Sequence, residues 1–101
     1  MIHIVIALVL SAGLAAAQTP ETDPATTEVL AGPCANCHGP AGRSPGAIPS
    51  IAGLDEDYAV AKMLAARADD DPKATVMPRL MKGYDEAQIR ALARWFAKVG
   101  Q

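Results

Sequence analysis

The sequence CANCHG, residues 34 to 39, contains the only two cysteines of this 101-residue chain, followed directly by a histidine. A chain of this length forms one small domain, which buries too little apolar surface to be secure without additional support. Only one Trp, two Tyr and one Phe are available as large rings. Small domains usually compensate with several disulfides or with a bound metal or cofactor, and two cysteines allow at most one disulfide. An interpretation of this motif therefore also has to account for what completes the small core.

Residues 1–17 predict an export signal rather than part of the domain. Ile4 to Leu10 form an unbroken apolar run, and Ala15 to Ala17 provide the small side chains that a signal peptidase requires. The run is too short to span a bilayer comfortably, and the segment contains no Lys or Arg. We expect cleavage after Ala17 and a periplasmic protein of the bacterial type. An uncleaved anchor and a misplaced start codon are the alternatives.

A polar, flexible lead is expected at residues 18–23 and a single domain at residues 24–101. Asp23 followed by Pro24 predicts a short helix that runs toward Gly32. Asp55 predicts the start of a second helix, which ends in the DDDP sequence at Pro72. Its apolar stripe is expected to consist of Tyr58, Ala61, Leu64, Ala65 and Ala68.

Asp85 and Gln88 form a capping-box pattern that opens a third helix toward Gly100. The apolar stripe of this helix is Ile89, Leu92, Phe96 and Val99. The Gly- and Pro-rich sequence from Gly39 to Gly53 predicts a long loop. No segment shows the alternation of a strand, so the predicted fold class is all-α, with three to four short helices and long loops.

Four chemistries use two thiols in this spacing with a histidine after the second. A redox disulfide of the thioredoxin kind needs a βαβ setting, which the pattern lacks. Structural zinc needs a fourth ligand, but the other histidine is His3 in the leader. A structural disulfide explains neither the histidine nor the small core. Covalent haem explains both, because Cys34 and Cys37 can add to two porphyrin vinyl groups while His38 presents its imidazole to the iron.

A ligand for the other face of the iron is predicted among three methionines. Met63 falls inside the second helix, where core packing is its expected role. Pro78 disfavours helical geometry at Met77, so the ATVMP sequence is expected to run extended, as a strap across a haem face. Met81 is expected in a short turn under that strap and stays the alternative ligand. A haem enzyme or gas sensor with an open sixth position is the competing hypothesis, which a Met77 ligand disfavours.

Over about residues 24 to 99 the chain resembles the class I c-type cytochromes. The resemblance rests on CANCH, IPSIAG, the methionine loop and a C-terminal helix with paired aromatic residues. It implies the class I cytochrome c fold around one covalently bound haem c, with thioethers from Cys34 and Cys37 and an axial pair of His38 and Met77. It also implies that the Pro49 carbonyl accepts the proton of the other His38 ring nitrogen. Such a protein is an electron carrier rather than an enzyme.

The same resemblance implies that the first and last helices cross closely at Gly32, against Trp95 or Phe96. Residues 74–99 are similar, more narrowly, to the cytochrome subunit of flavocytochrome c sulfide dehydrogenases, in which a flavoprotein partner supplies the electrons. The alternative is a free soluble periplasmic carrier that serves a respiratory or photosynthetic chain. Neither alternative involves nucleic acid or a stable membrane span after cleavage of the signal.

The net charge of −2 conceals a local excess of basic residues near the methionine loop. Arg79 and Lys82 flank this loop and are expected to form a basic rim that steers an acidic partner, although an ordinary solvated helix face is an equal alternative. The three consecutive acids Asp69 to Asp71 are interpreted as a solvent-exposed loop that ends a helix rather than as a cation site.

Overall fold

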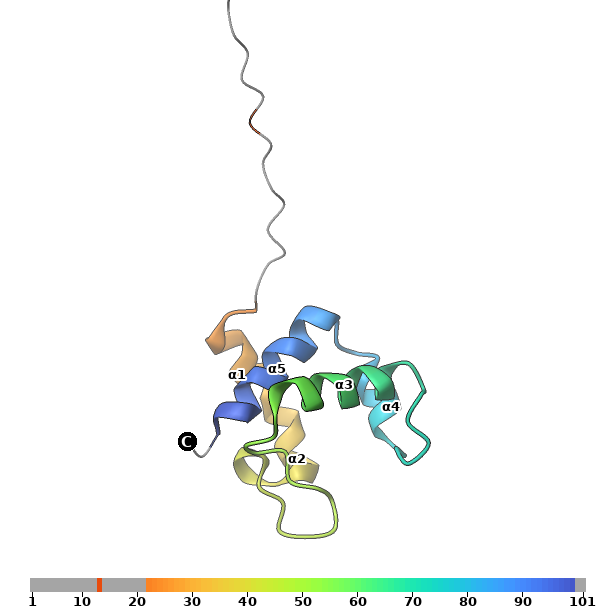
Figure 1. The fold of residues 1–101 in the computed structure, drawn as a ribbon. Helices are drawn as coiled ribbons and strands as arrows, with labels where there is room; N and C mark the ends of the chain where they lie inside the picture. The colour runs from red at the N-terminus through yellow and green to blue at the C-terminus, as the bar shows by residue number, and fades with distance from the viewer. Residues whose placement is uncertain (1–12, 14–21, 100–101) are drawn as a thin grey trace, which may run out of the picture.

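The computed structural model describes residue 13 and residues 22–99, and it consists of helices joined by turns and loops (Figure 1). The element order is α1 (Pro24–Ala31), a 3-10 turn (Gly32–Cys34), α2 (Ala35–His38), a second 3-10 turn (Pro40–Gly42), α3 (Glu56–Arg67), α4 (Met77–Met81) and α5 (Glu86–Lys98). No strand occurs within residues 22–99, which confirms the predicted all-α class. The predicted signal peptide, apart from Gly13, and residues 18–21 of the predicted lead lie outside the described residues.

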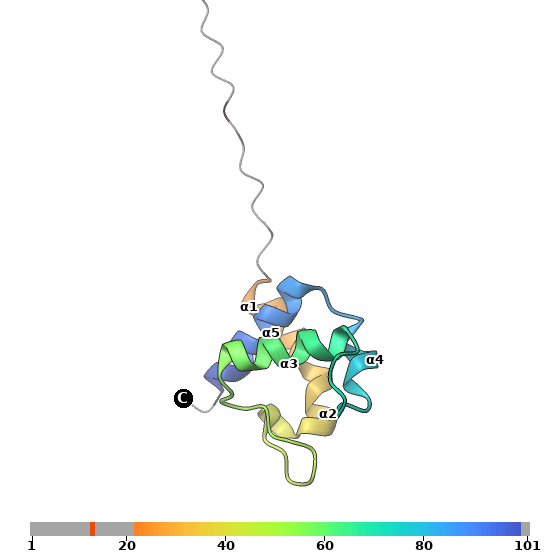
Figure 2. The ribbon, with the colours of Figure 1, turned by 45° about the vertical axis from the view of Figure 1, so that its right-hand side comes forward.

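The helices are arranged around α5, which packs against both α1 and α3. In both ribbon views α4 lies beside the C-terminal end of α3, and the C-terminal end of α5 lies on the opposite side of the domain (Figures 1 and 2). α2 and the long loop that follows it lie below α3 in these views. The cysteine–histidine motif and the two methionines of α4 are therefore carried by separate segments around α3.

All three predicted helix starts are confirmed by their caps. Asp23 accepts the Thr26 N–H at 3.0 Å, with Pro24 as the first helical residue. Asp55 accepts the Tyr58 N–H at 2.9 Å. Asp85 and Gln88 form a reciprocal capping box, in which Asp85 accepts the Gln88 N–H at 2.8 Å and Gln88 accepts the Asp85 N–H at 3.0 Å. Local side-chain chemistry thus sets where each long helix begins.

The end of α3 was predicted wrongly. The helix ends at Arg67 rather than continuing to the DDDP sequence and Pro72. Ala68 leaves the helical conformation, and Asp69 adopts a left-handed backbone with φ of 56°. The N–H of Asp70 then donates to the Ala65 carbonyl at 2.8 Å, which turns the chain away from the helix axis. The three acids therefore belong to the loop that leads to α4.

The core is small and centres on α5, whose Ile89 and Leu92 are the largest fully buried side chains. Leu92 and Phe96 pack with Ala31 of α1 in one cluster. Ala93 packs with Ala59 and Val60 of α3 in a second cluster. The predicted stripe of α5 is largely confirmed, although Val99 is only half-buried and caps the helix end.

The predicted apolar stripe of α3 is not the face that the structure buries. The buried residues are Ala59, Val60 and Ala66, whereas Tyr58 is 54% exposed. Ala61 and Ala68 are also exposed, and Leu64 and Ala65 are half-buried. The helix is rich in alanine, so its sequence gave little contrast between two apolar faces. One face packs against α5, and the second apolar face is left with much of its surface uncovered.

Gly32 does not make the predicted close helix crossing. A Cβ built at Gly32 would meet no atom within 4 Å, and the residue is exposed. The small residues buried on α1 are Thr27 and Ala31, one turn apart. The glycine that Phe96 requires is Gly42, because a Cβ there would lie 3.0 Å from the Phe96 ring.

Candidate functional site

Both cysteines and the histidine lie within about one helical turn. Cys34 ends the first 3-10 turn, and Cys37 and His38 end α2. Both thiols are free, with Cys34 half-buried and Cys37 exposed. Burial raises the pKa of the Cys34 thiol above its ordinary value of 9.0, so this sulfur stays protonated near neutral pH. Residues three apart on a helix share a face, which is the placement that bonding to one flat group requires.

His38 is fixed by a contact across the long loop. Its Nδ1 lies 2.6 Å from the carbonyl oxygen of Pro49, eleven residues later. A carbonyl can only accept, so Nδ1 carries the proton and donates it to Pro49. The lone pair of Nε2 is then available to a metal, and the contact also fixes the plane of the ring. This is the contact that the resemblance to c-type cytochromes implies.

Backbone hydrogen bonds hold the loop that delivers the Pro49 carbonyl. The Gly42 carbonyl accepts the N–H groups of Ile51 at 2.8 Å and Ala52 at 3.1 Å, which closes the base of the loop. The Gly53 N–H donates to the Phe96 carbonyl at 2.8 Å and so attaches the loop to α5. Gly42 has φ of 77°, and a Cβ there would lie 2.8 Å from Ile51. Glycine is therefore required at the point where the loop closes.

The predicted extended strap around Met77 is not observed. Val76 is helical in its backbone, and Met77 is the first residue of the short helix α4. Pro78 is accommodated because a proline in the first turn of a helix loses no backbone hydrogen bond. Met77 remains half-buried. The methionine segment therefore presents Met77 from the start of a helix rather than from an extended chain.

The other two candidate methionines, Met63 and Met81, contribute to the packing of the domain. Met81 is only 3% exposed, and it lies one turn after Met77 on α4. Met63 packs against both core clusters, as its position in α3 predicted. Of the three candidates, Met77 is the one with partial exposure that is not assigned to a core cluster. The burial of Met81 and the packing of Met63 in the core leave Met77 as the candidate without an assigned role in the core.

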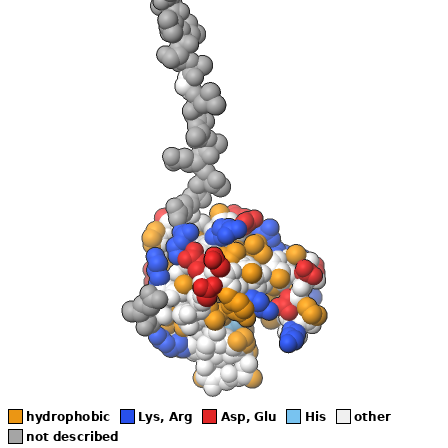
Figure 3. Space-filling model, viewed as in Figure 1, with side chains coloured by type: hydrophobic (Ala, Val, Ile, Leu, Met, Phe, Trp, Pro, Cys, Tyr) orange, Lys and Arg blue, Asp and Glu red, His pale blue; other side chains and the backbone are white. Residues whose placement is uncertain are grey.

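The donor set and the surrounding surface fit a covalently bound haem. The chain offers two free thiols on one turn, an imidazole with a free Nε2 and a half-buried thioether. Hydrophobic side chains gather on one face between a central acidic group and the loop at the lower end of the domain (Figure 3). Ile48, in the long loop after α2, is among the large apolar side chains that are exposed. A flat apolar group would cover surface of this kind, which the small core leaves open.

The zinc hypothesis gains no support from the structure. Within residues 22–99, no group of three or more His, Cys, Asp and Glu side chains is placed to hold a metal ion.

No helix in the described part of the chain is long and apolar enough to cross a membrane.

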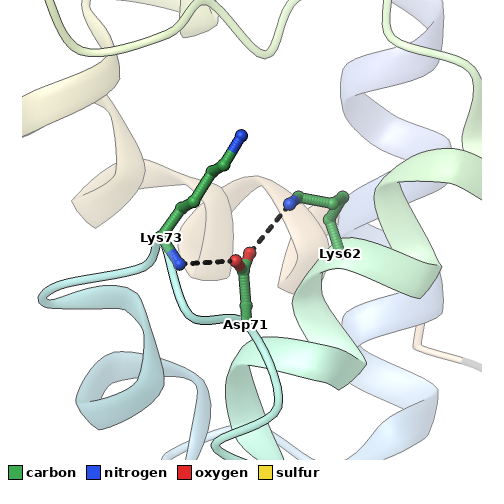
Figure 4. Close-up of polar contacts among 3 residues, drawn as sticks. All are labelled: Lys62, Asp71 and Lys73. Carbon is green, nitrogen blue, oxygen red and sulfur yellow. Dashed lines mark hydrogen bonds and ion pairs between the residues drawn. The ribbon is translucent and has the colours of Figure 1, made fainter.

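Asp71 is a structural residue that the sequence analysis missed. Its carboxylate accepts from Lys62 Nζ at 2.8 Å and from the backbone N–H of Lys73 at 3.1 Å (Figure 4). The hydrogen bond from Lys62 and then that from the Lys73 backbone hold the pKa of Asp71 below its ordinary value of 3.8. The same contact raises the pKa of Lys62 above 10.5. No local signal predicts this pair, because its partners are nine residues apart and meet only through the loop after α3.

The expected basic rim is only partly present. Lys82 Nζ forms an ion pair with Asp69 at 2.7 Å and also donates to the Pro78 carbonyl at 3.2 Å. Arg79 is exposed and has no ion-pair partner among the described residues. Arg79 therefore offers an available positive charge beside α4, whereas the charge of Lys82 is largely balanced within the chain.

Comparison with known proteins places these features in one family. The family model described as cytochrome c matches residues 25–99. The cytochrome subunit of sulfide dehydrogenase from Chlorobaculum tepidum is 34% identical over 74 residues, which cover 73% of this chain and 66% of that protein. The matched segment thus spans slightly less than two thirds of the relative.

Proposed function

The chain belongs to the cytochrome c family, and we propose on this basis that it carries one haem c held by Cys34, Cys37, His38 and Met77. The predicted class I fold and the function of a haem electron carrier, rather than an enzyme, are confirmed by the family. The contact between His38 Nδ1 and the Pro49 carbonyl supports the proposed ligand most directly. It selects the tautomer and the ring orientation that an axial imidazole needs.

Each of the four residues has its own role in holding the haem. Cys34 and Cys37 would each hold the haem through a thioether, in which the thiol sulfur joins one carbon of a vinyl group and the thiol proton joins the other carbon. His38 would bind the iron through Nε2, and Met77 would bind it through its thioether sulfur. The haem supplies one-electron chemistry when it is bound. If both side chains bind the iron, no position on it is left for a substrate, which would favour transfer of single electrons.

Mass spectrometry and absorption spectroscopy test the number of haem groups and their attachment to the chain. We expect purified protein from the native host to gain the mass of one haem and to give the pyridine haemochrome spectrum of a group joined through two thioethers. A mass gain of zero or two haems contradicts the proposal. A spectrum typical of a group with unreacted vinyl groups would instead show that Cys34 and Cys37 do not form the attachment.

We further propose a flavoprotein as electron donor, because the relative from Chlorobaculum tepidum is named as a subunit of sulfide dehydrogenase. The surface around α4 is the proposed docking face, since it combines exposed Val76 and Leu80 with the available charge of Arg79. Apolar side chains would supply affinity, and the charge would speed the encounter with an acidic partner. A free soluble carrier with exchangeable partners is the second candidate.

Stopped-flow reduction by the co-purified flavoprotein across a salt series separates these candidates. Arg79→Glu should slow association by about tenfold at low salt and flatten its dependence on salt, with the haem spectrum unchanged. Lys98→Glu is the matched control, because Lys98 ends α5 on the side of the domain opposite α4 (Figure 1). An effect on dissociation alone indicates a stable subunit interface. Equal rates in both variants would place docking elsewhere.

We also propose that the protein is exported and functions in the periplasm, since residues 1–17 have the composition of a signal peptide. N-terminal sequencing of the protein from its native host tests this proposal. A mature chain that begins at Gln18 is expected, and retention of Met1 contradicts cleavage.

A further inference from the structure

The segment that carries Met77 is held to the rest of the domain mainly by side chains. The backbone hydrogen bonds described for residues 74–84 outside α4 all close within residues 71–84. Three cationic side chains connect this segment with α3 and its end: Lys62 with Asp71, Lys82 with Asp69, and Arg67 with the Tyr84 carbonyl. Burial of Met81 adds an apolar contact. The position of Met77 therefore depends on the packing of α4 against α3 and on these side-chain interactions.

Among these ion pairs, the one between Lys62 and Asp71 has the most shielded carboxylate. The Asp71 side chain is 12% exposed, whereas that of Asp69 is 67% exposed. Two further pairs, Glu86 with Arg90 and Glu56 with Arg94, also have well-exposed carboxylates. Exposed pairs contribute little because water and salt screen them, and the attraction grows as water is excluded. Among these four ion pairs, the pair of Asp71 and Lys62 is thus the strongest electrostatic attachment of the segment that carries Met77.

Figure 4 shows how this pair acts on the loop backbone. Lys62 reaches out from α3 to the carboxylate, while the side chain of Lys73 extends away and only its backbone N–H donates to Asp71. The Ala74 N–H also donates to the Asp71 carbonyl at 3.1 Å, which makes a turn. The ion pair therefore holds a turn whose next residues lead directly into Met77.

We propose that Asp71, paired with Lys62, is the positioning residue that holds Met77 in its ligating position. This inference rests on the proposed role of Met77 as an axial ligand. Local opening of this segment away from α3 would remove the thioether from the site. A competing ligand binds only while the segment is open, so its apparent affinity rises in proportion to the open fraction. Loss of the ion pair is expected to raise that fraction.

Imidazole titration of the oxidised haem protein measures this open fraction. The weak red-edge band from sulfur to iron reports Met77, and its loss follows displacement by imidazole. Asp71→Asn keeps an acceptor for the Lys73 N–H but removes the charge that Lys62 binds. We expect Asp71→Asn and Lys62→Met each to bind imidazole at least about fivefold more tightly than wild type. The double variant should gain no more than either single one, because the two changes remove the same interaction.

Asp70→Asn is the matched control, since it removes an equal charge from the adjacent residue. The Asp70 carboxylate has no partner among the described residues, so imidazole affinity should stay at the wild-type value. Added salt should tighten imidazole binding more in wild type than in Asp71→Asn, in which only the pair of Lys82 and Asp69 remains. Unchanged affinity in Asp71→Asn overturns the inference, even if that variant melts at a lower temperature. If Asp71→Asn fails to retain haem, Lys62→Met decides, because Lys62 is an exposed residue.

A wild-type protein without the sulfur-to-iron band would refute Met77 as ligand and hence the proposed function. The attachment of the segment is then measured by hydrogen exchange at the amides of residues 73–81. Faster exchange in Asp71→Asn than in Asp70→Asn supports the attachment, and equal exchange overturns it.

Discussion

The histidine side and the methionine side of the proposed site are held by different forces. On the histidine side, neutral backbone hydrogen bonds at Gly42 and Gly53 close the loop that brings the Pro49 carbonyl to His38. On the methionine side, ion pairs from Lys62 and Lys82 attach the segment to α3 and its end. Neutral hydrogen bonds respond little to salt, whereas ion pairs weaken with salt and with protonation of the acid. The two axial ligands should therefore differ in lability.

The largest effect is expected from removal of both thiols. In Cys34→Ser with Cys37→Ser, covalent attachment is lost, and the small core around Ile89 and Leu92 lacks the apolar group that would complete it. We expect a largely disordered product by circular dichroism. A haem-free variant that melts cooperatively would contradict this prediction, and it would show that the helices alone form a stable domain.

Gly42→Ala, on the histidine side, is expected to lower the free energy of unfolding by a smaller but substantial amount. A left-handed backbone costs a residue with a Cβ about 1–2 kcal/mol. Overpacking against Ile51 and Phe96 adds about 1–3 kcal/mol. Gly46→Ala in the same loop is the matched control, since a Cβ there meets nothing within 4 Å. Urea unfolding of the haem protein measures both, and equal stabilities would show that the loop closure adapts without cost.

The smallest effect on the free energy of unfolding is expected from protonation of Asp71 on the methionine side. Because the pKa of Asp71 is lowered in the folded protein, its stabilising contribution is complete above the ordinary value of 3.8 and is lost as the pH falls through the lowered value. The difference in the free energy of unfolding between wild type and Asp71→Asn should thus be constant above about pH 5 and shrink below about pH 4. A difference that stays constant down to acid unfolding contradicts the assignment.

Local patterns predicted the parts of the structure that local chemistry determines. The caps at Asp23, Asp55 and Asp85 were predicted because each side chain acts on a backbone N–H three residues later. The motif from Cys34 to His38 was recognised from spacing alone, and the His38 contact with Pro49 followed from the family resemblance.

Features that depend on tertiary structure were not predictable in this way. The buried face of α3 was misassigned because alanines lie on both of its faces, and only the packing of α5 selects between them. Gly42 rather than Gly32 meets Phe96, since the loop base and not the helix end approaches α5 there. Asp71 was taken for a solvent residue because its partner Lys62 lies on a preceding helix.

The spectrum of the oxidised protein after substitution of each methionine of α4 tests the proposed site most directly. Met77→Ala is predicted to lose the sulfur-to-iron band and to bind carbon monoxide in the reduced form, with its haem content unchanged. Met81→Ala is predicted to keep the band and to lose about 2–5 kcal/mol of stability, because this side chain is buried. A band that survives in Met77→Ala and disappears in Met81→Ala would contradict the assignment of the methionine ligand.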